Sequence, residues 1–348
     1  MRVVLYCQPL TGLGHYTRTL AIARELATAH EVHLAAGIRP FPGARDAPGV
    51  RFVDLPPLWR EEGRVVGAPL GERQRLLAAA VERVSPDVLL IEHFPFSKWE
   101  LEGEALAAVE AAGPARVVCS HRDIALGSDE RACEALARHF DAVLIHGDPA
   151  VTRLEDQLPW ADRIPVPVEY TGYVCGRAPG TRRAEPRMVV SAGGGVEAEA
   201  LLGACFEARQ LLGGGREVVA FAGPFAPEEA FARLGALGDV RRFTPDLAAW
   251  MAASDLSVSR AGYNTCADIL LSRARALVVP SPRMSDQRLR ARRLAELGVL
   301  ETLAPEDVTP QRLAEAMRHA LDRPRAEPTI ALDGARRTRE ILESLVER

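Results

Sequence analysis

Short apolar segments alternate with longer amphipathic segments along most of this chain. In the first half, β-rich apolar runs predict strands at Val3–Tyr6, Glu31–Ala35, Arg51–Asp54, Val88–Ile91, Arg116–Cys119 and Ala142–Ile145. Apolar residues at helical spacing predict helices at Thr19–Thr28, Gly71–Val84, Glu104–Ala112 and Asp129–Phe140. Because the strands are apolar throughout and helices lie between them, we expect a parallel sheet covered by helices on both faces.

The same alternation occurs again in the second half. Strands are predicted at Arg187–Ser191, Glu217–Phe221, Val240–Phe243, Leu256–Ser259 and Ala276–Val279. Helices are predicted at Glu197–Leu212, Pro227–Leu237, Asp246–Ala253, Asn264–Leu271 and Gln287–Glu296. We therefore expect two Rossmann-like α/β domains at 1–172 and 187–331, joined by a Gly-, Pro- and Arg-containing linker at 173–186. Residues 332–348 are expected to form a last helix that can pack back on the first domain.

Composition narrows the class of protein. The 348 residues suit two domains, and a hydrophobic content of 47% with 26% charged residues is typical of a globular chain. A net charge of −4 disfavours nucleic acid as a partner. The N-terminal residues are typical of a strand and not of a signal peptide. The 6 cysteines include no C-x-x-C pair. We expect a cytoplasmic protein with reduced thiols. The segments Leu76–Val84 and Phe94–Leu101, apolar with arginines nearby, leave open a peripheral contact at the inner face of a membrane.

Ligands of open parallel sheets bind at the carboxyl ends of the strands, so the loops there hold the candidate chemistry. After the first strand, Gly12 and Gly14 permit a tight turn into a helix. A dinucleotide fingerprint is disfavoured, because Thr17 stands at its third glycine position and no acid follows the second strand. His15 is either a general base or a histidine that only caps the helix.

The loops of the second half suit a diphosphate. Gly193 and Gly194 follow the first strand there, but Lys98 is the only lysine of the chain, which excludes a P-loop. In Ser259–Asp268 a strand ends, a glycine turns the chain and a helix begins, so backbone amides at 262–265 can face an anion. Asp268 lies one turn into that helix, where its carboxylate can accept hydrogen bonds from ribose hydroxyls.

Polar residues at strand ends of the first half are acceptor-side candidates. Glu92 and His93 follow one apolar strand, and His121 and Asp123 follow the next. Either Glu92 or Asp123 is placed to orient His15, although each is equally compatible with an ordinary polar strand end. The isolated His-x-Asp pairs at 121 and 146 do not amount to a metal site, and no metal is expected.

Three motifs carry a resemblance to a known family. Ser259–Asp268 resembles S-R-[AS]-G-x-x-T-x-x-E, Asp286–Ala291 resembles H/Q-Q-x-x-N-A, and Thr11–His15 resembles G-G-x-G-H. These are motifs of the family 28 nucleotide-sugar glycosyltransferases, which include the peptidoglycan lipid-intermediate N-acetylglucosaminyltransferase. The chain is also similar to a group of predicted bacterial glycosyltransferases in the stretches Tyr6–Gln8, Ile145–Pro149, Tyr170–Val174 and Ala261–Thr265.

The resemblance implies a GT-B fold, in which two Rossmann-like domains face each other across a cleft. It implies a donor nucleotide in the second domain, an acceptor mainly in the first, and inversion at the anomeric carbon without an essential metal. The sequence agrees with the last point, because it contains no Asp-x-Asp motif, which holds the metal and the diphosphate in the other major glycosyltransferase fold. In the residues that match, the resemblance implies that His15 is the catalytic base. It also implies that the helix start binds the diphosphate, that Asp268 binds the ribose and that Gln287 contacts the donor sugar. The backbone at Phe243 is implied to recognise the nucleotide base. The donor-side candidates are Gly193, Gly194, Phe243, Arg260, Gly262, Tyr263, Asn264, Thr265, Asp268, Asp286 and Gln287.

The chain departs from the family pattern at three positions. Asp268 replaces the family's Glu, Arg290 replaces its Asn, and Asp286 precedes the glutamine. Because these positions lie at the ribose and the sugar, the identity of the sugar stays open.

The sequence thus predicts a metal-independent inverting hexosyltransferase that uses a nucleotide-diphosphate sugar, with UDP the favoured nucleotide. The sugar nucleotide is a substrate, and no cofactor is expected. The acceptor is a hydroxyl of a lipid-linked molecule, a glycan or a small molecule. Two alternatives stay open: a hydrolase or epimerase of the same fold, and a non-catalytic nucleotide-sugar-binding protein.

Overall fold

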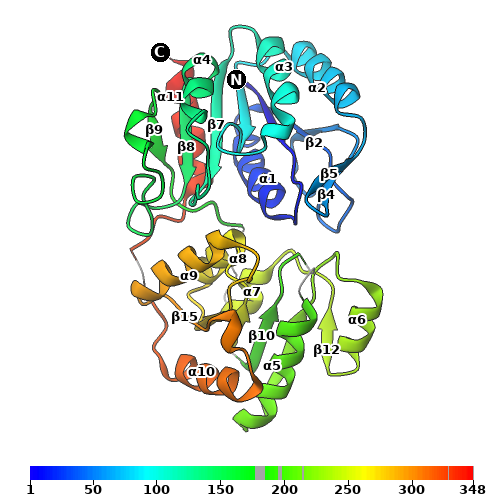
Figure 1. Cartoon of the computed structure of the whole chain (residues 1–348), viewed down its shortest axis with the longest axis vertical. Coiled ribbons are helices and arrows are strands. Elements are labelled where there is room, and N and C mark those ends of the chain that lie inside the picture. Colours follow the sequence, from blue (N-terminus) through cyan, green and yellow to red (C-terminus); the bar gives the residue numbers. More distant parts are fainter. Residues whose placement is uncertain (177–184, 195–197, 214, 328, 348) are drawn as a thin grey trace. The chain divides into compact units, whose positions relative to one another are not determined.

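The computed structural model describes residues 1–176, 185–194, 198–213, 215–327 and 329–347. They divide into two compact units, which are drawn in Figure 1. The first unit comprises Met1–Val174 and Asp333–Arg348, and the second comprises Cys175–Leu332. Among the described residues, no helix has the length and apolar character needed to cross a bilayer.

The first unit is built on a parallel sheet with the strand order β3-β2-β1-β6-β7-β8-β9. Its strands are β1 (Arg2–Cys7), β2 (Glu31–Ala36), β3 (Val50–Asp54), β6 (Val88–Glu92), β7 (Arg116–Arg122), β8 (Ala142–His146) and β9 (Val168–Tyr170). Its helices are α1 (Gly14–Leu26), α2 (Leu70–Val84), α3 (Glu102–Ala112), α4 (Ala132–His139) and α11 (Gly334–Val346). An antiparallel hairpin joins β4 (Leu58–Glu61) to β5 (Arg64–Gly67).

Alternate residues of β1 enter two different cores, as expected for a strand buried on both faces. Val3, Leu5 and Cys7 pack with α1 and with Leu342 of α11. Val4 and Tyr6 pack on the other face, with residues of α2, α3 and α4. The chain therefore returns from the second unit to complete one face of the first, and Figure 1 shows α11 in red beside the first unit's strands.

The second unit contains a parallel sheet with the order β12-β11-β10-β13-β14-β15. Its strands are β10 (Glu185–Ser191), β11 (Glu217–Phe221), β12 (Asp239–Arg241), β13 (Ser254–Ser259), β14 (Ala276–Val278) and β15 (Glu301–Thr302). Its helices are α5 (Ala198–Leu212), α6 (Glu228–Gly235), α7 (Leu247–Ala252), α8 (Tyr263–Ser272), α9 (Ser285–Glu296) and α10 (Pro310–Asp322). Residues of α5 and α10 cover one face of this sheet.

The predicted α/β class with two Rossmann-like parallel sheets is confirmed, but several elements were missed. These are the hairpin β4–β5, the short edge strands β9 and β15, and helix α10. A signal for α10 was present, because Thr309 precedes Pro310 and its side chain accepts a hydrogen bond from Arg312 N at 3.2 Å. Residues 177–184 of the expected linker, Gly195 in the glycine run and Glu197 at the expected start of α5 lie outside the described residues.

Each sheet reverses its strand order at one point. In the first unit β1 lies between β2 and β6, and in the second β10 lies between β11 and β13. At such a switch point the loops after neighbouring strands diverge to opposite faces and leave a crevice. Candidate residues follow the strands at both points: Gly12–His15 after β1 with Glu92 at the end of β6, and Gly193–Gly194 after β10 with Arg260–Gly262 after β13.

Candidate active site

The loop after β1 places His15 in the first turn of α1. Gly12 has φ +64°, a conformation that a residue with a side chain adopts only with strain, and α1 begins at Gly14. Gln8 fixes the start of this loop, because its Nε2 donates to the carbonyl oxygens of Pro9 at 2.9 Å and Gly37 at 2.8 Å. Its Oε1 accepts from the buried guanidinium of Arg73 at 2.7 Å. The buried hydrogen bonds of Gln8 therefore hold the start of the glycine loop in place.

His15 contacts the carboxylate at the end of the neighbouring strand. Nδ1 of His15 lies 2.6 Å from Oε1 of Glu92, whose side chain is fully buried. The same carboxylate binds Arg18, one turn further along α1, and its Oε2 lies 2.5 Å from Nζ of Lys98. Although burial alone would raise it, the interactions with His15 and Lys98 hold the pKa of Glu92 well below its ordinary value. Glu92 is therefore ionised.

An ionised Glu92 fixes the tautomer of His15. Because a carboxylate only accepts hydrogen bonds, Nδ1 of His15 must carry the proton and donate it. Burial lowers the pKa of His15 to about 4, against the opposing effect of Glu92 and with a further lowering by Lys98. His15 is consequently a neutral imidazole near neutral pH, with its lone pair on Nε2. This is the form that a general base requires.

Two more imidazoles adjoin His15. The ring centroids of His15 and His93 are 4.7 Å apart, and those of His93 and His121 are 4.1 Å apart. Nδ1 of His121 lies 2.7 Å from the carbonyl oxygen of Arg122, and Nδ1 of His93 lies 2.6 Å from Oγ of Ser97. His93 has φ +72°, in the left-handed region that a residue with a side chain rarely adopts. In the part of the chain that the structure describes, Nε2 of His93 and Nε2 of His121 are buried without a hydrogen-bond partner.

These histidines line a cavity of about 210 Å³ in the first unit. A single water needs only ~10–15 Å³, so the cavity has room for a ligand group. The lining residues are Leu10, Thr11, His15, Arg60, His93, Phe96, Ser97, Lys98, His121, Arg122, Ile124, Ala125, Leu126, Gly127 and Ser128. The predicted acceptor-side residues His93 and His121 are thus brought together with His15.

Asp123 does not belong to this group. The hypothesis that Asp123 orients His15 is wrong, because Glu92 does so, while Oδ2 of Asp123 accepts a hydrogen bond from the hydroxyl of Tyr173 at 3.1 Å. Sequence reasoning also missed Arg18 and Lys98 as partners of Glu92. Lys98, as the only lysine of the chain, carried a signal for a special position.

The cluster of His15, Glu92 and His93 does not suit a metal ion. Their potential ligand atoms lie within 4.8 Å of one another. However, both oxygens of Glu92 are already bound by the cations Arg18 and Lys98, and Nδ1 of His15 donates to one of them. A divalent cation would have to displace these charges.

The segments proposed for membrane contact are mostly core. Phe94, Phe96 and Leu101 are buried, as are Leu77 and Val81 of α2. Leu76 is exposed, and Trp99 is covered by the guanidinium of Arg131, which lies 3.8 Å from the ring centroid. These apolar residues therefore hold the first unit together and offer little continuous surface to a bilayer.

In the second unit the candidate donor residues follow the carboxyl ends of several strands, and those after β10 and β13 lie at the switch point of the sheet. Gly193 turns the chain after β10 with φ +74°, and Gly262 caps α8. The N-terminus of α8 directs its backbone N–H groups outward, as at any helix start, and this favours an anion. Phe243 follows the carboxyl end of the edge strand β12. Arg260 is buried, with Nη1 donating to the carbonyl oxygens of Val279 and Pro280 at 3.3 Å each.

Hydrogen bonds inside the second unit fix the residues of α9. Arg290 is fully buried, and its Nη1 donates to the carbonyl oxygen of Ala261 at 2.9 Å and to Oδ2 of Asp286 at 3.1 Å. Oε1 of Gln287 accepts from the backbone N–H of Ser281 at 2.9 Å, so its NH₂ group is the end of the side chain that can donate to another group. The departure from the family pattern at Arg290 thus links α9 to the turn before α8. Burial raises the pKa of Asp268, on α8, to about 7.

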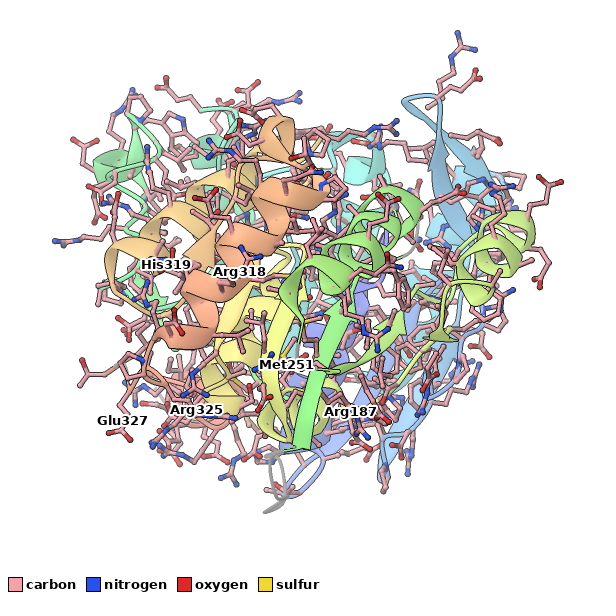
Figure 2. All side chains as sticks on the ribbon, turned by 90° about the horizontal axis from the view of Figure 1, so that it is seen from below. Arg187, Met251, Arg318, His319, Arg325 and Glu327 are labelled. Carbon is pink, nitrogen blue, oxygen red and sulfur yellow. The ribbon has the colours of Figure 1, made fainter. Side chains whose placement is uncertain are left out.

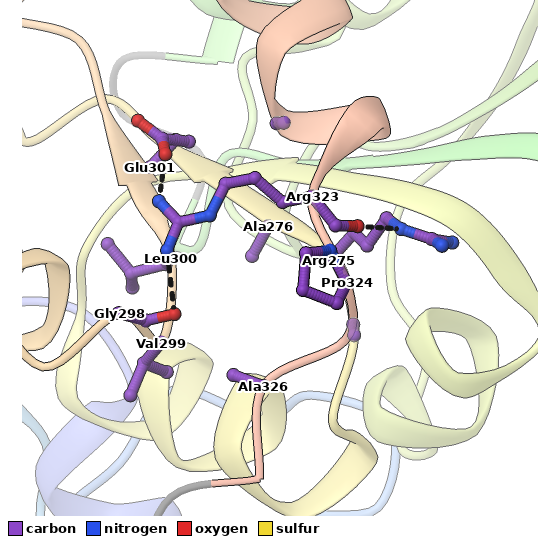
Figure 3. Close-up of a pocket in the computed structure, with 11 residues that line it drawn as sticks. Arg275, Ala276, Gly298, Val299, Leu300, Glu301, Arg323, Pro324 and Ala326 are labelled. Atoms are coloured by element: carbon purple, nitrogen blue, oxygen red, sulfur yellow. Dashed lines mark hydrogen bonds and ion pairs between the residues drawn. The ribbon is translucent and has the colours of Figure 1, made fainter.

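A small cavity lies at the amino ends of two strands of the second unit. At the amino ends of β14 and β15, Nη2 of Arg323 donates to the carbonyl oxygen of Gly298 at 2.9 Å, and the same guanidinium pairs with Glu301 (Figure 3). The cavity there measures about 10 Å³, no more than one water needs. Arg325, which is labelled in Figure 2, donates to the carbonyl oxygen of Ser254 at the start of β13, at 2.9 Å. These arginines close the amino ends of the strands.

Comparisons with known proteins found a family match in the second half of the chain. Residues 188–341 match the Glycosyltransferase family 28 C-terminal domain. A curated relative from Brucella anthropi, UDP-N-acetylglucosamine--N-acetylmuramyl-(pentapeptide) pyrophosphoryl-undecaprenol N-acetylglucosamine transferase, is 35% identical over 101 residues. That alignment covers 28% of this chain and 27% of the relative, so the match spans about a quarter of the relative's length.

Solved structures resemble the chain over its whole length. MurG of Acinetobacter baumannii superposes with a TM-score of 0.62 at 17% identity, covering 100% of this chain and 99% of that one. The glycotransferase of kitacinnamycin gives a TM-score of 0.64 at 18% identity, with coverage of 99% and 97%. At these identities the likeness establishes the fold. Residues 188–341 thus resemble the glycosyltransferase family 28 C-terminal domain, and the whole chain has the GT-B fold.

Proposed function

We propose that this protein is an inverting, metal-independent glycosyltransferase that takes a hexose from a nucleotide-diphosphate sugar. The observation that carries the proposal is the family 28 match over 188–341, which spans the start of α8, Asp268 and Gln287. The His15–Glu92 pair in the cavity of the first unit supplies the second half of the argument. Donor binding by the second unit and acceptor binding by the first are parts of this proposal.

In the proposed reaction, Nε2 of His15 takes the proton of an acceptor hydroxyl. The freed oxygen attacks the anomeric carbon from the face opposite the diphosphate, the bond from that carbon to the diphosphate breaks, and the configuration inverts. Glu92 stabilises the imidazolium that forms, and Arg18 and Lys98 keep Glu92 ionised. The N-terminus of α8 stabilises the negative charge on the departing diphosphate, so no metal is invoked.

We infer a pyrimidine nucleotide as the donor carrier, with UDP favoured. The curated relatives are named for UDP-N-acetylglucosamine, whereas the spinosyn rhamnosyltransferase SpnG, similar in fold at 18% identity, was solved with thymidine diphosphate. The name of the Brucella relative includes a lipid-linked acceptor. For this chain we propose a hydroxyl acceptor reached from the cytoplasm, with peripheral membrane contact where that acceptor is a lipid.

Calorimetry of the purified protein with UDP, TDP, GDP, ADP and NAD tests the donor site. We expect one pyrimidine diphosphate to bind most tightly and Asp268→Ala to weaken it. A protein that binds none of the pyrimidine diphosphates, or that binds only NAD, contradicts the proposal.

The role of His15 is tested by turnover of the sugar nucleotide. His15→Gln should lower kcat by about 10²–10⁴-fold, the range for loss of a general base, and leave the affinity for UDP unchanged. Free sugar released without any acceptor would identify a hydrolase instead. Donor binding without turnover under any acceptor would identify a binding protein.

A further inference from the structure

The polarity of the cavity in the first unit restricts what it can bind. Its positive groups already bind protein partners, because Lys98 pairs with Glu92 and Arg60 pairs with Glu100. Nε of Arg122 donates to the carbonyl oxygen of Ile124 at 3.2 Å. Leu10, Phe96, Ile124 and Leu126 add apolar wall. A phosphate would have to compete with these partners for the cations of the cavity.

The imidazoles in the cavity present hydrogen-bond acceptors. Nδ1 of His15 donates to the carboxylate of Glu92, and Nδ1 of His121 must donate to the carbonyl oxygen of Arg122, since a carbonyl oxygen only accepts. Burial lowers the pKa of both rings, to about 4 and about 3, so each ring holds a single proton, on Nδ1. The Nε2 atoms of His15 and His121 therefore both carry lone pairs.

The lone pair of His121 has an energetic consequence. Its Nε2 is buried without a partner among the described residues, and a buried acceptor left unsatisfied destabilises the structure until a donor reaches it. Hydroxyl and N–H groups satisfy such an acceptor, whereas anionic oxygens are repelled by it. Since His93 contacts both neighbouring rings, His15 and His121 lie close enough for one small ring to reach both.

We propose that the acceptor group entering this cavity is an uncharged, hydroxyl-bearing ring, which donates one hydroxyl to Nε2 of His15 and a second hydrogen bond to Nε2 of His121. This rests on the proposed function, because it takes the cavity as the acceptor side. The hydroxyl on His15 is the one that is deprotonated, and the bond to His121 orients the ring. An acceptor bound at this point through a phosphate is the rival.

Ring-nitrogen spectroscopy tests the proposal without turnover. In protein labelled with ¹⁵N-histidine, long-range ¹H–¹⁵N correlations report the tautomer of each ring, and we expect His15 and His121 to be protonated on Nδ1. Hexyl β-D-glucopyranoside should shift the Nε2 resonances of both rings, and hexyl phosphate at the same concentration should leave them unchanged. Shifts with hexyl phosphate alone, shifts with neither probe, or Nε2-protonated rings overturn the proposal.

A matched pair of variants locates the contact. His121→Asn keeps an amide N–H for the carbonyl of Arg122 and removes the Nε2 acceptor, so it should weaken glucoside binding about tenfold. His319→Asn, at an exposed histidine on α10, should not change it. Equal binding to both variants overturns the role of His121, provided thermal melting shows that both are folded. Calorimetry with UDP is independent of these measurements, so failure of the proposed function and failure of this inference are distinguishable.

Discussion

Glu92 determines the chemistry available to His15. This buried carboxylate contacts one neutral imidazole and two permanent cations, so its charge is stabilised more strongly than a His–carboxylate pair alone would achieve. Burial is the largest cause of the lowered pKa of His15, and the charges of Lys98 and Arg18 lower it further, against the opposing effect of Glu92. His15 is thereby kept as a free base over a wide pH range, with Glu92 ready to stabilise the imidazolium that forms during a reaction.

Replacing Lys98 by Met should raise the pKa of His15 from about 4 toward the ordinary ~6.5. The charge of Lys98 lowers this pKa, and burial, which is the larger cause, remains, so the shift is upward but incomplete. Because His15 accepts a proton only above its pKa, the acid limit of its function moves to higher pH. NMR titration of the ring measures the shift. Lys98→Arg retains the charge and should leave the pKa in place; an equal shift in both variants would contradict the argument.

The affinity for UDP should depend on the ionisation of Asp268. Burial raises the pKa of this carboxyl to about 7, so it is largely protonated at pH 6 and ionised at pH 8. Only the carboxylate accepts from both ribose hydroxyls, so we expect binding to strengthen with pH, by up to about tenfold per unit below the pKa. Calorimetry should detect this pH dependence in the wild type and a smaller one in Asp268→Asn. The diphosphate of UDP titrates equally in both experiments, so the difference between the two proteins reports on Asp268 alone. Identical pH profiles would exclude Asp268 from the site.

At the scale of elements, α8 and α9 act as one block. Arg290 joins them from inside, by binding Asp286 on its own helix and the carbonyl oxygen of Ala261 before α8. Because the guanidinium of Arg290 is fully buried, water cannot take the place of these hydrogen-bond partners. The helix start that is proposed to bind diphosphate and Gln287, proposed to contact the sugar, are therefore held in a fixed relation.

Arg290→Met should lower the free energy of unfolding by about 3 kcal/mol or more, because it removes a fully buried cation that binds Asp286. Adding Asp286→Asn should restore part of the loss. Arg288→Met, on the same helix but in an exposed pair with Glu306, should cost at most about 1 kcal/mol. Urea unfolding of the full chain measures all three. A similar cost for the two arginines would show that the buried link is not what holds α9.

The sequence predicted the elements with the strongest patterns. Strands such as Val88–Ile91, apolar throughout, identified the parallel sheets, and glycines before apolar helices located α1 and α8. The weakly patterned elements were missed: β15 has two residues, and β4 and β5 pair only with each other. His15 and Glu92 were both identified, but the contacts of Arg18 and Lys98 depend on how α1 and the segment after β6 converge in space. No spacing in the sequence encodes that convergence.

At the scale of the whole molecule, the chain passes from the first unit to the second and returns. Helix α11 completes a face of the first sheet, where the fully buried Leu342 packs with residues of α1 and β1. The stability of the first unit therefore depends on residues that are synthesised after the whole second unit. The second unit, by contrast, is continuous in sequence.

Leu342→Ala should destabilise the first unit by about 2–5 kcal/mol, the cost of a cavity in a packed core. Val346→Ala, on the same helix but 37% exposed, should cost less than about 0.5 kcal/mol. Because the α8 and α9 block contains no residue of α11, UDP binding measured well below the melting temperature should survive both substitutions. Thermal unfolding followed by circular dichroism gives the stability, and calorimetry gives the binding. Loss of UDP binding in a Leu342→Ala protein that is still folded would show that the donor site depends on the returning helix, against the division into units drawn from the contacts.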